Sequence, residues 1–265
     1  MKIYISADIE GITGVTHWNE TEMQKPESNE FRDQMTAEVG AACEGALEAG
    51  ATEILLKDAH DTARNIHASR LPQQVRLIRG WSGHPFMMAQ ELDESFAGII
   101  MIGYHSRASA ASSPLAHTMT GKAVYVKIND HYASEFLINA YTAALCKVPV
   151  VFVSGDRGLC DEVAAFDARI GTAAVKTGIG DSTVSIHPAV AVARIRQGVA
   201  AALTGKAAKS PVPLPPHFAV EIRFKNHPDA YHAAFFPGVT LKEPHTVQFG
   251  GDNWFEVLRA FAFLF

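Results

Sequence analysis

The sequence has 265 residues and a net charge of −5, with 48% hydrophobic and 19% charged residues, which is typical of a well-packed globular protein and excludes disordered and fibrous classes. No basic stripe or Arg-rich run is present, so we expect no nucleic-acid partner. No secretion signal is visible, and no apolar run reaches the ~20 residues of a membrane helix, so we expect a cytoplasmic protein with no membrane contact. Cys43, Cys146 and Cys160 show no C-x-x-C spacing and indicate neither disulfides nor a thiolate zinc site.

Short apolar runs alternate with segments of helical periodicity from the N-terminus onward. The opening strand, Met1 to Ile5, leads through Ser6 to Gly11 into a Gly-rich turn. A helix is expected from about Ser28 to Ala49, because apolar residues recur there at close to helical spacing and Gly50 follows as a stop. Further strands are expected at 52–57, 75–78, 97–102, 123–128 and 148–153, further helices at 85–94, 133–146 and 188–203, and a small polar loop at 106–113.

The alternation of strands and helices indicates a parallel or mostly parallel sheet that is covered on both faces, because its strands are almost continuously apolar. We therefore predict an α/β fold with three layers, in which helices lie on both faces of a mostly parallel sheet. Each strand with a clear apolar pattern is followed by acidic or histidine side chains, and ligands of open α/β sheets bind along the carboxyl edge. The residues concerned are Asp8, Glu10, Asp58, His60, His105 and Asp156.

The segment 209–216 has four prolines in eight residues and is typical of a stiff linker. It divides the chain into an α/β domain over residues 1–208 and a small C-terminal α+β domain over residues 217–265. The second domain is expected to contain strands at 218–224 and 246–249 and a final helix from about Asn253. Because this helix has too many apolar side chains for one narrow face, we expect part of it to dock on a partner subunit or on the main domain.

Two acidic residues, Asp8 and Glu10, follow the opening strand two positions apart. In an extended segment they project to the same side, so their like charges repel unless water, a shared proton or a cation intervenes. A turn or helix-cap role is the competing interpretation. Two acids would repel a pyrophosphate, so this edge favours cations. Asp156 follows a later strand, and two roles stay open for it. Its carboxylate could hold a ligand imidazole, or it could cap the next turn.

Several other side chains are candidates with an ordinary alternative. Asp58 and His60 repeat the geometry of the first pair and suit zinc or manganese, but a solvated loop explains them equally well. His105 is either a ligand or a buried histidine that hydrogen-bonds to the backbone. His117, beyond the polar loop, suits a proton shuttle, although loops also carry histidines without a role. Glu135 is explained by the dipole of the helix that it opens.

These candidates belong to a set of short motifs along the chain. The motifs are S-A-D-I-E-G at 6–11, K-D-A-H at 57–60 followed by R-N-I, G-Y-H at 103–105, H-T at 117–118, the N, E and N-A pattern from Asn129 to Ala140, S-G-D at 154–156, the Lys176 loop with His187-Pro188, N-H-P at 226–228 and F-P-G at 236–238. Together they resemble the zinc-dependent D-aminopeptidase family, once described as dipeptide transport proteins. The likeness runs nearly from end to end, and the D-x-E-G opening combined with the spaced histidines is specific.

The resemblance implies a site with two zinc ions in the domain of residues 1–208, which would be the metal-binding catalytic domain. The implied metal ligands are Asp8, Glu10, His60, His105 and Glu135, with His117 beside them as the catalytic histidine. It also implies a ring-like homodecamer whose interior holds the active sites. The chain departs from the family pattern at Asp61 and Ser134, where glycines are usual. These changes affect the expected pocket shape and substrate preference more than metal binding.

The implied function is that of a zinc metallo-aminopeptidase, which would hydrolyse short peptides with a free N-terminus, D-amino-acid or glycine dipeptides among them. Three carboxylates and two imidazoles nearly balance two divalent ions and leave room for a bridging hydroxide, a nucleophile at neutral pH. His117 would shuttle the proton to the leaving amine or stabilise the oxyanion. Two other functions stay open: a metal-dependent amidase or phosphoesterase, and a non-catalytic dipeptide-binding protein that supports transport.

Overall fold

The computed structural model describes residues 1–205 and 210–265, and its largest element is a seven-stranded sheet in the order β3-β2-β1-β4-β7-β8-β9. Every neighbouring pair is parallel except β8 and β9, which are antiparallel at one edge. Its strands are β1 Lys2–Ala7, β2 Glu53–Asp58, β3 Val75–Ile78, β4 Gly98–Tyr104, β7 Val150–Asp156, β8 Gly171–Ile179 and β9 Ser182–Ser185. Buried apolar side chains line β1, β4 and β7 almost continuously, as expected for strands that are covered on both faces.

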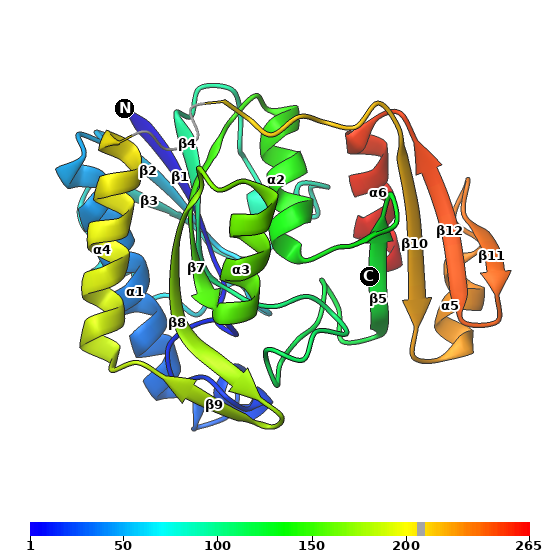
Figure 1. Cartoon of the computed structure of the whole chain (residues 1–265), viewed down its shortest axis with the longest axis horizontal. Helices are drawn as coiled ribbons and strands as arrows, with labels where there is room; N and C mark the ends of the chain where they lie inside the picture. The colour runs from blue at the N-terminus through cyan, green and yellow to red at the C-terminus, as the bar shows by residue number, and fades with distance from the viewer. Residues whose placement is uncertain (206–209) are drawn as a thin grey trace.

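Helices cover both faces of this sheet (Figure 1). On one face α1 (Ser28–Glu48) packs against α4 (Pro188–Thr204), and both share a core with inward side chains of β1, β2 and β4. On the other face lie α2 (Glu135–Leu145) and α3 (Arg157–Phe166), over a second core. The predicted three-layer α/β fold is confirmed.

Local signals set several element boundaries where the sequence predicts them. Gly50 follows α1 with a φ of +91°, a conformation that glycine adopts without strain. Ser134 caps α2, because its hydroxyl accepts a hydrogen bond from the N–H of Leu137 at 3.2 Å. Pro188 occupies the first turn of α4, and Gly205 follows its end.

A second sheet of five strands, in the order β11-β12-β10-β5-β6, is antiparallel throughout. Its strands are β5 Ala123–Ile128, β6 His131–Tyr132, β10 Phe218–Phe224, β11 Thr240–Glu243 and β12 Thr246–Gly251, and α5 His227–Ala233 lies between β10 and β11 in the chain. Two of these strands precede the proline-rich segment and three follow it. The small sheet is therefore shared between the two parts of the chain that the sequence separates at 209–216.

The final helix, α6 (Trp254–Leu264), packs on the main part of the chain. The indole N–H of Trp254 donates to the hydroxyl of Thr142 in α2 at 3.1 Å, and its ring lies 5.3 Å from that of Tyr141. Buried residues of α6, α2, β10 and β7 form one continuous core. Most of the apolar surface of α6 is thus covered within the chain, while Phe263 stays 74% exposed.

Two local predictions are wrong. The helix expected at 85–94 is a single 3₁₀ turn, η3 (Met87–Ala89), because Met87 and Glu91 take positive φ angles of 46° and 66° that a helix cannot include. Lys176, placed in a loop by the motif analysis, lies within β8. The sequence analysis did not identify six of the helices and strands, α3, β6, β8, β9, β11 and α5, or the 3₁₀ turns η1 (Trp18–Glu20) and η2 (Ala68–Arg70).

The division of the chain into residues 1–208, 209–216 and 217–265 stays a prediction, and the start of the linker at Lys209 lies outside the described residues. From residue 210 onward the proline-rich segment touches the protein interior, because Val212 is buried and Leu214 packs on the second core. Across both described ranges, no helix combines the length and the apolar character that crossing a membrane requires.

Candidate metal centre

Six candidate residues meet at the carboxyl edge of the seven-stranded sheet. β1, β2 and β4 are neighbours there, so the segments that follow them start side by side. A loop between β4 and β5 and the first turn of α2 bring the remaining side chains. The six residues are Asp8, Glu10, His60, His105, His117 and Glu135, and their ligand atoms form three groups in which all atoms lie within 4.8 Å of one another.

Asp8 belongs to two of these groups, which we name the Glu10 triad (Asp8, Glu10, His60) and the Glu135 triad (Asp8, His105, Glu135). In the Glu10 triad, Nδ1 of His60 lies 3.3 Å from Oδ1 of Asp8 and 3.0 Å from Oε2 of Glu10. In the Glu135 triad, Nε2 of His105 lies 3.5 Å from Oδ2 of Asp8 and 3.5 Å from Oε2 of Glu135. The two oxygens of one carboxylate therefore face different triads.

Backbone carbonyls leave one nitrogen of each triad imidazole free for the centre. Nε2 of His60 lies 3.0 Å from the carbonyl oxygen of Thr21 and donates to it, so Nδ1 carries no proton in the neutral ring and faces the Glu10 triad. Nδ1 of His105 lies 2.9 Å from the carbonyl oxygen of Ser106 and donates to it, so Nε2 is left toward the Glu135 triad. A carbonyl that fixes the tautomer in this way is a common partner of metal-binding histidines.

His117 sits beside the Glu135 triad, with its ring stacked on that of His105 at a centroid distance of 4.3 Å. Its Nδ1 donates to the carbonyl oxygen of Leu115 at 2.9 Å, and its Nε2 lies 3.6 Å from Oε1 of Glu135. It also forms a group of possible ligand atoms with Glu10 and His105. Its side chain is 15% exposed, against 8% for His60 and 0% for His105, so it is the imidazole most open to a substrate.

Burial and mutual charge shift the pKa values of the cluster. Burial, followed by the charge of Glu10, raises the pKa of Asp8 well above its usual range. Burial lowers the pKa of His105, but the charges of Glu135, Glu10 and Asp8 and a hydrogen bond to Glu135 together outweigh this effect and raise the pKa to about 10. Burial and the neighbouring His105 lower the pKa of His117. Three buried carboxylates at this spacing need positive charge between them, from protons on the imidazoles or from cations.

Two buried atoms of the cluster have no hydrogen-bond partner within residues 1–205 and 210–265, Oε2 of Glu10 and Nε2 of His105. Buried polar atoms nearly always have partners, so unpartnered ones indicate a group that the protein is built to receive. Both atoms are aimed at neighbouring ligand atoms without the geometry of a hydrogen bond. Carboxylate oxygens and imidazole nitrogens are ligands that zinc accepts, so the donor set fits this ion.

Asp58, which the sequence offered as a possible ligand, lies outside both triads. Its Oδ2 accepts from the backbone N–H groups of Asn65 at 2.6 Å and Ile66 at 2.9 Å, and its Oδ1 accepts from the Asn65 side-chain amide at 3.1 Å. The same amide donates to the carbonyl oxygen of His60 at 2.8 Å. Asp58 therefore holds the turn that carries His60 and has no oxygen left for an ion.

Of the two roles that the sequence left open for Asp156, the structure shows the cap, and its contact with His105 is only indirect. It caps α3, because its Oδ1 accepts from the N–H of Leu159 at 2.9 Å. Its Oδ2 accepts from the N–H of Ser106 at 2.6 Å. Since the carbonyl of Ser106 orients His105, Asp156 acts on the ligand imidazole through the neighbouring backbone and does not touch the ring.

Lys176 stabilises the loop after β1, which carries Asp8 and Glu10, and the sequence did not reveal this role. Its buried ammonium donates to the carbonyl oxygens of Glu10 and Val15, the latter at 2.6 Å. Burial lowers its pKa to about 8. A lysine within a strand pattern gives no local signal of such a role, because its two acceptors lie more than 160 positions away in the chain.

Two glycines allow the loop after β1 to touch the end of β4. A Cβ atom on Gly11 would lie 1.7 Å from the carbonyl oxygen of Tyr104, and one on Gly103 would lie 2.2 Å from that of Asp8. Gly103 also takes a φ of +71°. The N–H of Gly11 donates to the carbonyl oxygen of Gly103 at 2.8 Å. This contact sets the spacing between Asp8 and His105.

A cavity of about 680 Å³ opens beside the triads, large enough for a short peptide. Part of its wall is apolar, with Trp18, Trp81, Met119 and Phe261. Its polar side chains outside the triads include Asp61, which has a positive φ of 46°. Of these wall residues the sequence analysis singled out only Asp61, as a change that affects the pocket shape. It did not predict Trp18, Trp81, Met119 and Phe261, because they come from four separate parts of the chain.

Comparisons with known proteins agree with this site. A family model described as D-aminopeptidase matches residues 1–263. A D-aminopeptidase of Bacillus subtilis (strain 168) is 33% identical over 262 residues, which cover 98% of this chain and 95% of the relative. The solved structure of the Zn-dependent D-aminopeptidase DppA from Bacillus subtilis, described as a self-compartmentalizing protease, matches with a TM-score of 0.94 and 32% identity over 100% of this chain and 96% of that one. The chain belongs to the D-aminopeptidase family.

Proposed function

We propose that this protein is a zinc-dependent aminopeptidase that hydrolyses short peptides with a free N-terminus, D-amino-acid or glycine dipeptides among them. The observation that carries the proposal is Asp8, whose two oxygens face two triads of buried ligand atoms. A carboxylate in this position is suited to bridge two cations. The family and the zinc-dependent relative support both the metal and the reaction class.

In this proposal the residues of the Glu10 triad would hold one zinc ion and those of the Glu135 triad would hold a second. Bound zinc supplies a water of lowered pKa and polarises the scissile carbonyl. The tautomers of His60 and His105 are already fixed by the carbonyl groups of Thr21 and Ser106, so little reorientation is needed on binding. The centre is preorganised by the backbone of the loops that carry it.

His117 is the residue to which we assign proton transfer. Its Nδ1 is anchored on the carbonyl of Leu115, which leaves Nε2 facing the centre. From there it can donate to the leaving amine or hydrogen-bond the oxyanion of the tetrahedral intermediate. The ring is held by stacking on His105 and by the edge of Trp18 at 5.3 Å, so its position is defined before a substrate arrives.

We further propose that the protein acts in the cytoplasm as a homo-oligomer, with a ring-like homodecamer as the specific form. The self-compartmentalizing relative supports this, because it matches over the whole chain. Sedimentation or light scattering tests the size: a decamer of 28.6 kDa chains is expected, and a monomer at micromolar concentration would contradict the assembly without affecting the metal centre.

The decisive experiment couples metal quantification to a substrate panel. The purified protein is dialysed and its zinc content per chain is measured, and cleavage of dipeptides in L and D forms is compared with that of peptide amides and phosphate esters. We expect two zinc ions per chain and release of the N-terminal residue from dipeptides. Absence of metal, preferential cleavage of phosphate esters, or tight dipeptide binding without cleavage would each overturn the proposal.

A further inference from the structure

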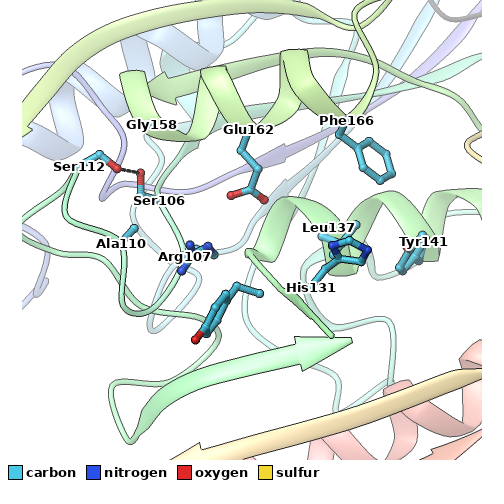
Figure 2. Close-up of a pocket in the computed structure, with 11 residues that line it drawn as sticks. Ser106, Arg107, Ala110, Ser112, His131, Leu137, Tyr141, Gly158, Glu162 and Phe166 are labelled. Atoms are coloured by element: carbon cyan, nitrogen blue, oxygen red, sulfur yellow. Dashed lines mark hydrogen bonds between the residues drawn. The ribbon is translucent and has the colours of Figure 1, made fainter. Parts of the chain in front are cut away.

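A second cavity, of about 540 Å³, adjoins the metal centre without including any of its six residues. It lies between α2, α3 and the loop 106–112, and Figure 2 shows its side chains. Its volume is within the range of about 300–1,000 Å³ that small-molecule sites have. Nothing in the proposed peptidase reaction uses it.

The cavity has one carboxylate and one guanidinium that are not paired with each other, and the imidazole of His131 also lines it. Glu162 extends from α3 into the space, and Arg107 enters it from the loop below (Figure 2). Within the described residues no ion pair joins them, so more than 4.0 Å separates their charged atoms. Opposite charges that face one cavity without meeting leave room for a ligand that carries both signs.

Both charged groups are held in place by the protein. The hydroxyl of Ser134 donates to Oε1 of Glu162 at 2.5 Å, and the guanidinium of Arg107 donates to the carbonyl oxygen of Ala108 at 3.1 Å. The same guanidinium lies over the ring of Tyr132, 4.5 Å from its centroid. Groups that are fixed before binding lose little conformational entropy when a ligand arrives.

One wall of the cavity is apolar. Leu137 and Tyr141 from α2 and Phe166 from the end of α3 line it. The rings of Tyr141 and Phe166 meet edge to face at a centroid distance of 6.5 Å. A ligand with an apolar side chain can therefore contact this wall while its charged ends meet the two polar groups.

We propose that this cavity binds a small zwitterion with a free ammonium and a free carboxylate, a chemistry that amino acids and short peptides share. The ammonium meets Glu162 and the carboxylate meets Arg107, each through charge-assisted hydrogen bonds. The apolar wall favours a ligand with an aromatic or large aliphatic side chain. The site itself stands on the geometry of the cavity, and only the source of the ligand, product or substrate of a peptidase, rests on the proposed function.

The cavity is connected to the supports of the metal centre through one residue that lines it and one that hydrogen-bonds to its glutamate. Ser106 lines it, and its carbonyl oxygen orients His105. Ser134, which donates to Glu162, caps the helix that begins with the ligand residue Glu135. A zwitterion in the cavity would lie against Ser106 and would reach Ser134 through Glu162, so we expect its binding to change turnover at the centre.

Equilibrium dialysis of the full-length, zinc-loaded protein with radiolabelled D- and L-phenylalanine tests the site. The variants are Glu162→Gln, which keeps an acceptor for Ser134, and Arg107→Gln. We expect each variant to weaken the affinity for the phenylalanine bound in this cavity by about tenfold or more, because each removes a charge-assisted contact. Two probes serve as matched ligands, since N-acetylphenylalanine lacks the ammonium and phenylalanine amide lacks the carboxylate, and both are expected to bind there weakly.

The source of the ligand is tested with alanyl-phenylalanine and the His117→Ala variant, which is expected to bind the dipeptide without cleaving it. Tighter binding of the dipeptide than of phenylalanine identifies a substrate, and the reverse identifies a product. The site would be refuted if wild type bound no zwitterion, for example because a neighbouring subunit covers the cavity. It would also be refuted if both variants bound phenylalanine as tightly as wild type does, or if N-acetylphenylalanine and phenylalanine amide both bound as tightly as phenylalanine.

Turnover of an amino-acid p-nitroanilide, which lacks a carboxylate, measures the coupling to the metal centre. Added phenylalanine should change kcat in the wild type but not in Glu162→Gln, whereas competition at the triads would raise KM in both. An unchanged kcat despite binding would overturn the coupling. An enzyme with no peptidase activity would overturn the proposed function instead, because the dialysis measurement does not depend on activity.

Discussion

Asp8 and Asp58 follow neighbouring parallel strands, and both carboxylates are fully or almost fully buried. Asp58 accepts three hydrogen bonds from Asn65 and Ile66, so both of its oxygens are used within its own turn. Asp8 accepts one, from the N–H of Ile9 at 2.9 Å, and otherwise faces two triads of ligand atoms. Two similar positions in the sequence thus lead to a scaffold in one case and to a candidate bridging ligand in the other.

The difference shows what makes a buried carboxylate available for a cation. A carboxylate that is surrounded by N–H donors is stabilised as an anion and keeps no free lone pair toward an ion. A carboxylate next to other carboxylates is destabilised until a cation arrives, as the raised pKa of Asp8 reflects through burial and the charge of Glu10. Substitutions at the two positions should therefore have opposite effects in the absence of metal.

The largest effect is expected for Asp8→Asn. Both triads lose a shared charged side chain, so the zinc content and the peptidase activity should both fall. The loss of activity should exceed the roughly 10–100-fold that follows when a residue that hydrogen-bonds to a metal ligand is substituted. In metal-free protein the variant should melt at a higher temperature than wild type, because one of three repelling carboxylates is gone. Zinc quantification and calorimetry with a chelator measure both effects, and a lower melting temperature would contradict the electrostatic argument.

The next largest effect is expected for His117→Ala. Zinc content should stay at the wild-type value, while kcat should fall by about 10²–10⁴-fold, the range for loss of a general acid or base. Metal quantification beside steady-state kinetics on a dipeptide makes the measurement. Loss of zinc together with activity would instead assign His117 to the ligands, as its grouping with Glu10 and His105 allows.

Asp58→Ala should destabilise the fold with or without metal. It leaves two buried backbone N–H groups without an acceptor and removes one of the two acceptors of the Asn65 side-chain amide. We expect this to cost about 3 kcal/mol and to lower Tm by roughly 6–12 °C. Asp58→Asn retains one acceptor and should cost about half as much. Calorimetry with and without chelator is the measurement, and a loss confined to the zinc-loaded form would make Asp58 a ligand after all.

The smallest effect concerns Lys57, which precedes Asp58 in the chain. Burial lowers the pKa of the Lys57 ammonium to about 8. Its ammonium donates to the carbonyl of Gly80 and lies 4.0 Å over the ring of Trp81. Below pH 8 both folded and unfolded chains hold the proton, and between pH 8 and about 10.5 only the unfolded chain does, so this lysine contributes more stability as the pH rises. Wild type should therefore gain stability relative to Lys57→Met between pH 7.5 and 10 in thermal denaturation, and a constant difference would contradict the shift.

Much of the fold could be predicted because its signals are local. Gly50 and Pro188 mark helix ends through their own backbone chemistry, and the structure places the boundaries there. The partner of β5 could not be predicted in this way. Its sequence, A-V-Y-V-K-I, resembles that of the central strands, but it pairs with β10, about ninety positions away.

The candidate site was predicted in part for similar reasons. Asp8, His60 and His105 follow apolar strands that a parallel sheet aligns, so their convergence could be expected. Glu135 has an adequate local explanation as the first residue of α2, and only the resemblance to a family selected it. The role of Lys176 had no signal, because it depends on carbonyl groups supplied by a distant loop.

The sequence by itself determined the kinds of side chain at the carboxyl edge and the helices and strands that carry them, because periodicity, caps and turn residues act over a few positions. Only the tertiary structure decided which carboxylates stay without donors. Asp58 is enclosed by a turn in which Asp61 and Ala63 take positive φ angles. Asp8 is held against its like-charged neighbours by the loop after β1, which meets the end of β4 where Gly11 contacts Gly103. The supply of hydrogen-bond donors around a buried charge depends on the whole fold, and this supply separates a scaffold from a metal centre.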